Sequence, residues 1–154
     1  MLSTFYTWSR EHIQRVFEAK SSEDCRQALD DTFSQRIDLT LNGTTLPRTH
    51  LQKAIMAMVE DSGFRLAVEW HNAVEVPRDD CNRAGMLGGY YVIRNIRKRL
   101  PGESTILVER HKSVNVIIES ESSDPSIDSR RIVKLAIVAT DMPMTPPTAH
   151  RQQQ

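Results

Sequence analysis

The chain has 154 residues, a length that fits one domain with a sizeable core better than two independent cores. Its 20 basic and 20 acidic residues cancel, so the protein has no overall field that would attract nucleic acid or an anionic membrane. We therefore expect neither of these partners.

The N-terminal segment MLSTFYTWSREHIQRVF lacks the basic stretch and following apolar run of a secretion signal, and no stretch of the sequence has the length of a membrane span. Cys25 and Cys81 are the only cysteines. A disulfide between them stays open, although two free thiols in an intracellular chain are the simpler interpretation. We therefore expect a cytoplasmic protein.

The first sixty residues predict three helices and a small hairpin. Apolar residues recur at helical spacing in the first helix, and Ser21 with Asp24 approximates a capping box that starts the second. A segment that alternates between apolar and polar residues then leads into Asn42-Gly43, which is a strong hairpin turn signal. Pro47 suits the first turn of the third helix.

Four long runs of strand-like sequence follow, at residues 64–76, 85–99, 104–120 and 130–140. In the first run, apolar and polar side chains alternate, as in a strand with one buried face. The connections are short and rich in turn residues, which favours antiparallel neighbours. We predict a curved, four-stranded antiparallel sheet whose apolar face the helices cover. A single domain would then span residues 1–141, and the proline- and glutamine-rich tail at 142–154 would be flexible.

Gly88-Gly89-Tyr90-Tyr91 lies inside the second of these runs. Each glycine within a strand costs about 0.5–1 kcal/mol relative to alanine, and such glycines usually mark a bulge or a bend at which the sheet curls. Because consecutive strand residues face opposite ways, at most one of the two tyrosines lines a pocket unless a bulge intervenes, and the sequence does not indicate which one.

This order of helix, helix, small hairpin, helix and four long strands resembles the nuclear-transport-factor-2-like (NTF2-like) superfamily, which includes polyketide cyclases, ketosteroid isomerase and scytalone dehydratase. The resemblance rests on FSQRIDLTLNGTTLPRTHLQKAI at 33–55, YYVIRNIRKR at 90–99 and RRIVKLAIVATD at 130–141. It implies a cone-shaped α+β roll in which the sheet wraps around a long first helix and leaves an apolar pocket open at one end. It also implies homodimers formed through the outer face of the sheet.

The resemblance also indicates where a catalytic base would lie. In ketosteroid-isomerase-like members the base is a carboxylate just before the hairpin turn, a position that falls near Thr40 in this sequence. Threonine has no charged form near neutral pH for that role. Asp38, two residues earlier on the same side of the strand, is a displaced candidate, and His71 is a second candidate for moving a proton.

Further residues are candidates for holding a substrate, namely Trp8, Trp70, Tyr90, Tyr91 and Arg94. Tryptophans supply apolar walls, a tyrosine supplies a hydrogen bond to a developing oxyanion, and Arg94 suits an acidic group. The alternative interpretations are core packing for Trp70, a water-facing position for Asp38 and a surface strand position for His71.

Two functional hypotheses follow. In the first, the protein binds a small, largely apolar molecule and, if it is an enzyme, catalyses a cofactor-free isomerisation, cyclisation or dehydration by general acid–base chemistry. In the second, it is a non-catalytic, dimeric protein-interaction module. The sequence has no HExxH, CxxC, GxSxG, GxxxxGKS/T or GxGxxG motif, so it gives no support for a metal, a cofactor or a nucleotide site.

Overall fold

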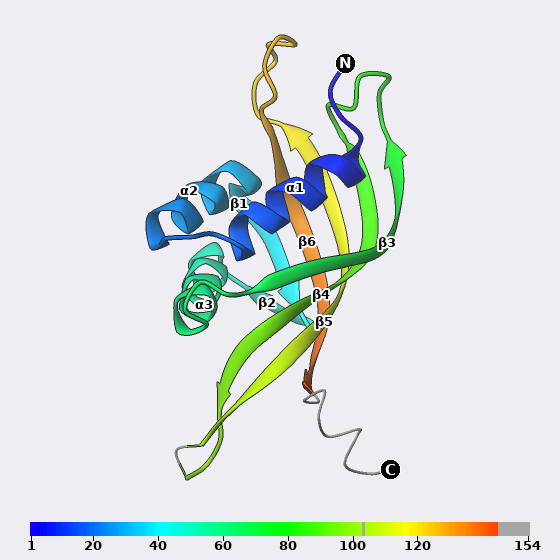
Figure 1. Ribbon diagram of the computed structural model, residues 1–154. Coiled ribbons are helices and arrows are strands. Elements are labelled where there is room, and N and C mark those ends of the chain that lie inside the picture. The colour runs from blue at the N-terminus through cyan, green and yellow to red at the C-terminus, as the bar shows by residue number, and fades with distance from the viewer. Residues whose placement is uncertain (103, 145–154) are drawn as a thin grey trace.

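The computed structural model describes residues 1–102 and 104–144, and within them three helices pack on one six-stranded sheet (Figure 1). The elements in chain order are α1 (Phe5–Phe17), α2 (Ser22–Thr32), β1 (Phe33–Leu41), β2 (Thr44–Leu46), α3 (Arg48–Asp61), β3 (Ala67–Pro77), β4 (Gly85–Arg99), β5 (Thr105–Ser120) and β6 (Arg130–Pro143). The predicted α+β order of elements is confirmed.

Local signals in the sequence account for the ends of the helices. The Thr4 hydroxyl accepts a hydrogen bond from the Thr7 N–H at 3.2 Å and so caps α1. Ser21 caps α2 in the same way, accepting from the Asp24 N–H at 3.1 Å. The helix α3 begins directly after Pro47. The three helices therefore start where hydroxyl and proline chemistry allow.

The strand order across the sheet is β2-β1-β6-β5-β4-β3. The four long strands pair antiparallel with their chain neighbours, as predicted. The hairpin strand β1 instead lies parallel to β6, with Leu39 opposite Leu135, so the sheet is mixed where an antiparallel sheet was predicted. A parallel pair needs a long connection, and the chain between β1 and β6 supplies one that includes α3 and the other long strands.

Irregular pairing bends the long strands of the sheet. Shifts in register lie between Trp70 and Asn72 in β3 and between Ile93 and Ile96 in β4. The second includes Asn95, whose φ of 73° is left-handed. Neither shift falls at the two adjacent glycines of β4, so of the predicted bulge or bend no bulge lies at that position.

Gly89 is required for a different reason, which is close packing by an indole ring. A Cβ atom on Gly89 would lie 2.7 Å from Cζ3 of Trp70. The missing side chain therefore lets the indole of Trp70 lie close to the backbone of β4.

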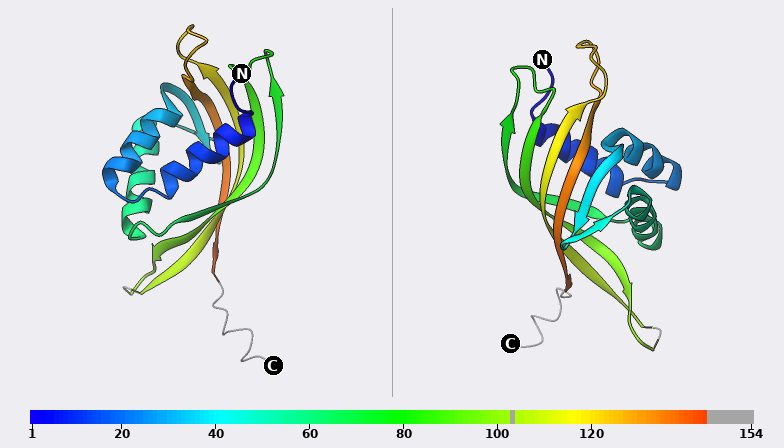
Figure 2. Two further views of the ribbon diagram at one scale, coloured as in Figure 1. Left: turned by 45° about the horizontal axis from the view of Figure 1, so that its top comes forward. Right: turned by 180° about the vertical axis from the view of Figure 1, so that it is seen from behind.

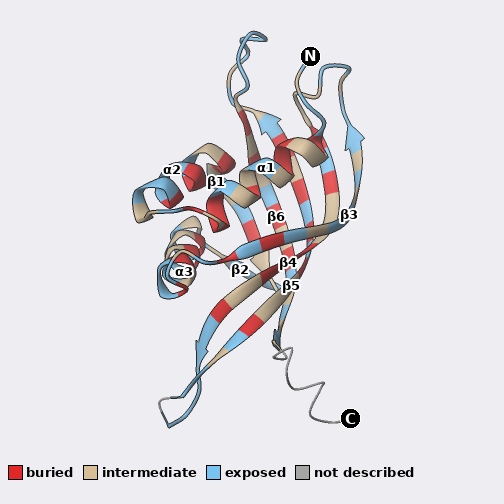
Figure 3. Ribbon diagram, viewed as in Figure 1, coloured by how far each residue is buried: buried red, intermediate tan, exposed pale blue. Residues whose placement is uncertain are grey.

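The helices cover only one face of the curved sheet (Figure 2). Most of the buried residues lie where the helices meet this concave face (Figure 3), and the largest fully buried apolar side chains include Trp8, Phe5, Phe17, Phe33, Leu29 and Leu39. On the outer face, Val74, Val76 and Val138 keep 75%, 64% and 68% of their surface exposed. The core therefore lies between the helices and the concave face.

The last strand extends past residue 141, where we predict the end of the domain. The strand β6 continues to Pro143, and the Met144 N–H donates to the Leu107 carbonyl at 3.0 Å. The rest of the predicted tail lies outside the described residues.

In the described ranges, no helix combines the length and the apolar character needed to cross a membrane. Cys25 is a buried free thiol and Cys81 an exposed one.

Candidate functional site

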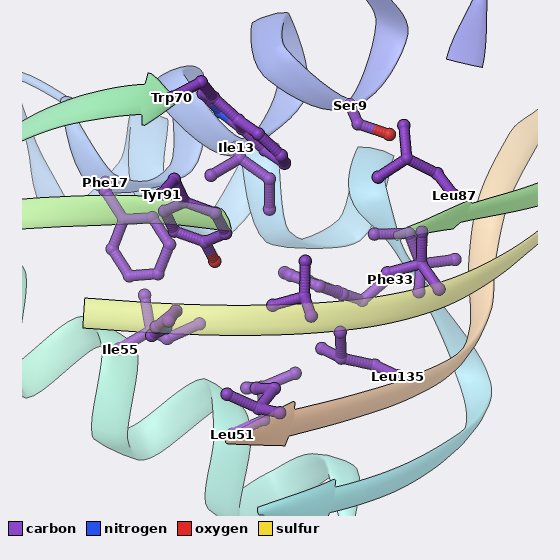
Figure 4. Close-up of a pocket in the computed structure, with 15 residues that line it drawn as sticks. Ser9, Ile13, Phe17, Phe33, Leu51, Ile55, Trp70, Leu87, Tyr91 and Leu135 are labelled. Carbon is purple, nitrogen blue, oxygen red and sulfur yellow. The ribbon is translucent and has the colours of Figure 1, made fainter. Parts of the chain in front are cut away.

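Two adjoining cavities lie between the helices and the concave face of the sheet. The inner cavity has a volume of about 20 Å³ and is enclosed by side chains from α1, α3 and the long strands (Figure 4). The second, which we call the mouth cavity, has a volume of about 410 Å³. Both are lined by Leu51, Ile55, Lys112 and Ile137, so they meet at these residues. The core fills most of the inner space, and of these two cavities only the mouth cavity has the size of a ligand site.

The mouth cavity is bounded by α3, by the hairpin strands β1 and β2, and by segments of β4, β5 and β6. Most of its wall is apolar, and this part includes Leu39, Leu41, Leu46, Ala54, Met58 and Ala139. Such a surface suits a hydrocarbon body of a ligand.

Charged groups gather in one part of the mouth cavity. Arg110 makes a two-pronged salt bridge with Asp141, from Nε to Oδ1 at 2.7 Å and from Nη2 to Oδ2 at 3.1 Å. Lys98 Nζ lies 3.9 Å from the same carboxylate. The hydrogen bonds from Arg110 are the main cause that holds the pKa of Asp141 below its ordinary value. Lys98, Arg110 and Lys112 thus face one carboxylate, and among the described residues positive charge is in surplus.

Lys112 is buried at the junction of the two cavities. Only 6% of its surface is exposed, and its Nζ lies 4.7 Å from the ring centroid of Phe17 and 5.6 Å from that of Tyr91. Burial is the main cause that lowers the pKa of Lys112 to about 7, and the positive charge of Arg110 lowers it further. The ammonium form and the free amine of Lys112 are therefore present in similar amounts near neutral pH.

No protein-family model matches the chain, and no curated protein matches its sequence. Solved structures do match it. Mtr2 from Candida albicans is 12% identical, with a TM-score of 0.57 over 90% of this chain and 97% of that one. An NTF-2-like protein of unknown function from Pseudomonas aeruginosa is 12% identical, with a TM-score of 0.56 over 88% of this chain and 98% of that one. The chain has the NTF2-like fold. Aln2 from a Streptomyces species is also similar, at 12% identity and a TM-score of 0.55 over 90% of this chain and 94% of that one.

At these identities the similarity establishes the fold and transfers no residue role. The predicted NTF2-like resemblance is confirmed at this level. Mtr2 has also been solved in complex with the Mex67 M domain.

Two of the predicted substrate-binding residues line the inner cavity of this NTF2-like fold. The ring centroids of Trp70 and Tyr91 lie 4.6 Å apart, and both rings face the cavity (Figure 4). Burial raises the pKa of Tyr91, so its phenol stays neutral and is able to donate a hydrogen bond. Trp70 Nε1 and Ser9 Oγ are buried without a hydrogen-bond partner among the described residues.

Trp8 lines neither cavity. Its indole is 2% exposed and stacks on the imidazole of His12, with 4.1 Å between ring centroids. Arg130 is also buried, and its guanidinium carbon lies 5.6 Å from the centroid of the Trp8 indole. The structure thus gives Trp8 a packing role and does not place it against a ligand in either cavity.

Tyr90, Arg94 and His71 gather on the outer face of the sheet, away from both cavities. The Tyr90 hydroxyl is hydrogen-bonded to Nδ1 of His111, and its ring centroid lies 5.2 Å from that of His71. Arg94 Nε lies 3.2 Å from a carboxylate oxygen of Glu109. The two consecutive tyrosines therefore face opposite ways, with Tyr91 inside.

Asp38 is exposed on β1, where the next residue, Leu39, is buried in the core. The structure thus brings neither Asp38 nor His71 to a cavity. Their catalytic roles stay predictions, and a base that acts inside the mouth cavity has to be another group.

The charged residues of the mouth cavity were missed by the sequence reasoning. A signal for them exists in the strand that reads VERHKSVNV, because Arg110 and Lys112 share the period-two positions of the buried Val114 and Val116. Basic residues at apolar positions of a strand contradict its pattern, and such contradictions mark functional sites.

Proposed function

We propose that the protein binds a small amphipathic molecule in the mouth cavity. The apolar body of this ligand lies against α3 and the hairpin strands, and its anionic group lies beside Arg110 and Lys98. One observation carries the proposal: a cavity of about 410 Å³ joins a largely apolar wall to three basic side chains that face one carboxylate. An anionic ligand group would balance the surplus of positive charge.

The two parts of the site contribute differently to binding. The apolar wall supplies about 0.8 kcal/mol for each methylene that it removes from water. A hydrogen bond to a charged group adds roughly 1.5–3 kcal/mol. A ligand of ten carbons therefore gains most of its affinity from its body, and the charged groups select the head group.

The proposal is tested by calorimetric titration with decanoate and with decanol, which share an apolar body and differ in charge. We expect decanoate to bind more tightly than decanol and to lose that advantage in high salt. Ala54→Trp fills the mouth cavity from an exposed position on α3 and should weaken decanoate binding at least tenfold. Ala57→Trp is the matched control, because Ala57 is exposed on the same helix and does not line the cavity.

Two results would overturn this proposal. In the first, neither compound binds at millimolar concentration. In the second, the two tryptophan variants bind decanoate as well as the unchanged protein does, which would place binding outside the mouth cavity.

If the protein is an enzyme, we propose that this cavity performs cofactor-free isomerisation, cyclisation or dehydration by general acid–base chemistry. Tyr91 lines the adjoining inner cavity as a neutral phenol and suits the role of hydrogen-bond donor to a developing oxyanion. Lys112 titrates near neutral pH, where general acid–base groups are most efficient.

A second candidate function is a dimeric interaction module, and the outer sheet face favours it. Val74, Val76 and Met86 line a hollow of about 380 Å³ on that face, and Val138 is exposed two residues along β6 from Ala136, which lines the same hollow. Exposed apolar patches mark interaction surfaces. If this face is a dimer interface, sedimentation at protein concentrations of about 10–100 μM should show a dimer. The double change Val74→Lys with Val138→Lys should then give a monomer, and a monomeric unchanged protein would contradict the idea.

A further inference from the structure

We propose that Lys112 is a reactive amine that forms an imine with an aldehyde or ketone ligand held in the mouth cavity. This inference rests on the proposed function, because the ligand reaches Lys112 through that cavity. It adds the chemical class of the ligand and a covalent step at a named atom.

The surroundings of Lys112 favour the free amine. The side chain is 6% exposed, and the described residues include no carboxylate in salt-bridge contact with it. The carboxylate of Asp141, on the neighbouring strand β6, accepts hydrogen bonds from Nε and Nη2 of Arg110. Burial in apolar surroundings and a neighbouring cation are the two conditions that activate a lysine as a nucleophile, and both are present here.

Among the other ionisable groups of the cavities, Asp141 raises the pKa of Lys112, but burial and the charge of Arg110 lower it more strongly. Lys98 on β4 and Arg110 on β5 are positive and oppose a further charge. Tyr91 is held neutral by burial, and His50 is an exposed residue of α3 that lines the mouth cavity. The parts of α1 that line the inner cavity are Ser9, Ile13 and Phe17, which carry no charge.

The position of Lys112 also gives its amine access to a ligand. Its side chain lines both cavities, so it lies at the inner end of a space of about 410 Å³. Arg110 lies two residues away on the same face of β5, a separation of about 6.6 Å along a strand. A fitting ligand therefore combines an apolar body, a carbonyl group and an acidic group within a few bonds of the carbonyl.

The reaction needs no oxidant or reductant. The Nζ lone pair forms a bond to the carbonyl carbon, the carbonyl oxygen gains a proton, and the nitrogen loses one, which gives a carbinolamine. The carbon–oxygen bond then breaks as the hydroxyl takes up a proton and leaves as water, the nitrogen gives up its remaining proton, and a carbon–nitrogen double bond remains. Amine and carbonyl compound are thus converted to imine and water.

The test uses the full chain with octanal and sodium cyanoborohydride at pH 7, followed by digestion and mass spectrometry of each lysine. The reductant converts any imine into a stable secondary amine, so no substitution at Lys112 is needed. At pH 7 about half of Lys112 is unprotonated, against roughly one part in 10³ of a lysine with an ordinary pKa. We expect Lys112 to be labelled at least about tenfold faster than the exposed Lys20 and Lys53.

Two further measurements test the route by which octanal reaches Lys112 and the pKa of the Lys112 amine. Decanoate and Ala54→Trp should both slow labelling at Lys112, because they occupy the mouth cavity. Labelling at Lys112 should level off above about pH 8, whereas labelling at the exposed lysines should keep rising. Equal labelling of Lys112 and the exposed lysines, with decanoate still bound, would overturn the imine and leave the proposed function standing. Equal labelling with no decanoate bound would overturn both.

Discussion

Replacing Lys112 by methionine should make the protein more stable at neutral pH. The pKa of Lys112 falls from its ordinary value of 10.5 to about 7 on folding, chiefly because of burial. Each pH unit in that interval corresponds to about 1.4 kcal/mol, so the whole interval corresponds to about 5 kcal/mol. At pH 7 the buried amine thus destabilises the fold by roughly 4 kcal/mol, and Lys112→Met should recover a large part of it.

The sign of the pH dependence follows from proton binding. Between pH 7 and 10.5 the unfolded chain holds a proton at Lys112 that the folded chain has largely lost. The free energy of unfolding therefore rises with pH in this range, by up to about 1.4 kcal/mol per pH unit. Below pH 7 both states hold the proton, and the full penalty applies. The methionine variant lacks this contribution at every pH.

The assay is urea unfolding of both proteins at several pH values from 6 to 9.5, using the difference between their unfolding free energies. This difference cancels other groups, such as the Cys25 thiol, whose pKa burial raises to about 11. We expect the advantage of Lys112→Met to shrink by about 2–3 kcal/mol between pH 7.5 and 9.5. Lys53→Met, on an exposed position of α3, should show a constant difference. A constant difference for Lys112→Met as well would refute the reasoning.

Three further predictions concern the fold. Gly89→Ala puts a methyl group 2.7 Å from an indole carbon and should lower the unfolding free energy by about 1–3 kcal/mol. Gly88→Ala should lower it less, and a larger loss for Gly88→Ala in urea unfolding would contradict this. Arg130→Met removes a buried guanidinium that binds the carboxylate of Asp128 and two main-chain carbonyls, and should cost roughly 1–3 kcal/mol in the same assay; an unchanged unfolding free energy would contradict it. In a colorimetric thiol assay only Cys81 should react in the folded protein, with Cys25 reacting after urea is added, and two fast thiols would exclude this.

The order of the elements was predictable because its signals are local. The Asn42-Gly43 turn, which includes Asn42 at a φ of 49° and Gly43 at 86°, closes the hairpin, and the Ser21 hydroxyl starts α2. The pairing of β1 with β6 has no such signal, since its partners, such as Leu39 and Leu135, lie 96 to 99 residues apart in the chain. Non-local strand pairing is set by the whole packed structure, and a single sequence shows it only weakly.

The site was harder to predict because the face on which a strand residue lies depends on register. The irregularity between Trp70 and Asn72 changes the alternation in β3, and no residue type in that segment announces it. The sequence therefore does not indicate that Tyr91 lies inside while Tyr90 and His71 lie outside. Lys112 was overlooked for another reason, which is that charged strand residues are usually assigned to water.

The predicted instability caused by Lys112 separates the two functional hypotheses. An interaction module that works through its outer face has no use for a buried amine that weakens the fold at neutral pH. A ligand site does have a use for such an amine, because binding or catalysis often requires a group that destabilises the folded protein. If Lys112→Met unfolds at higher urea, binds decanoate with a changed affinity and still sediments as the unchanged protein does, the amine serves the cavity and not the assembly. If the same variant alters sedimentation and leaves decanoate binding unchanged, the outer face is the functional surface.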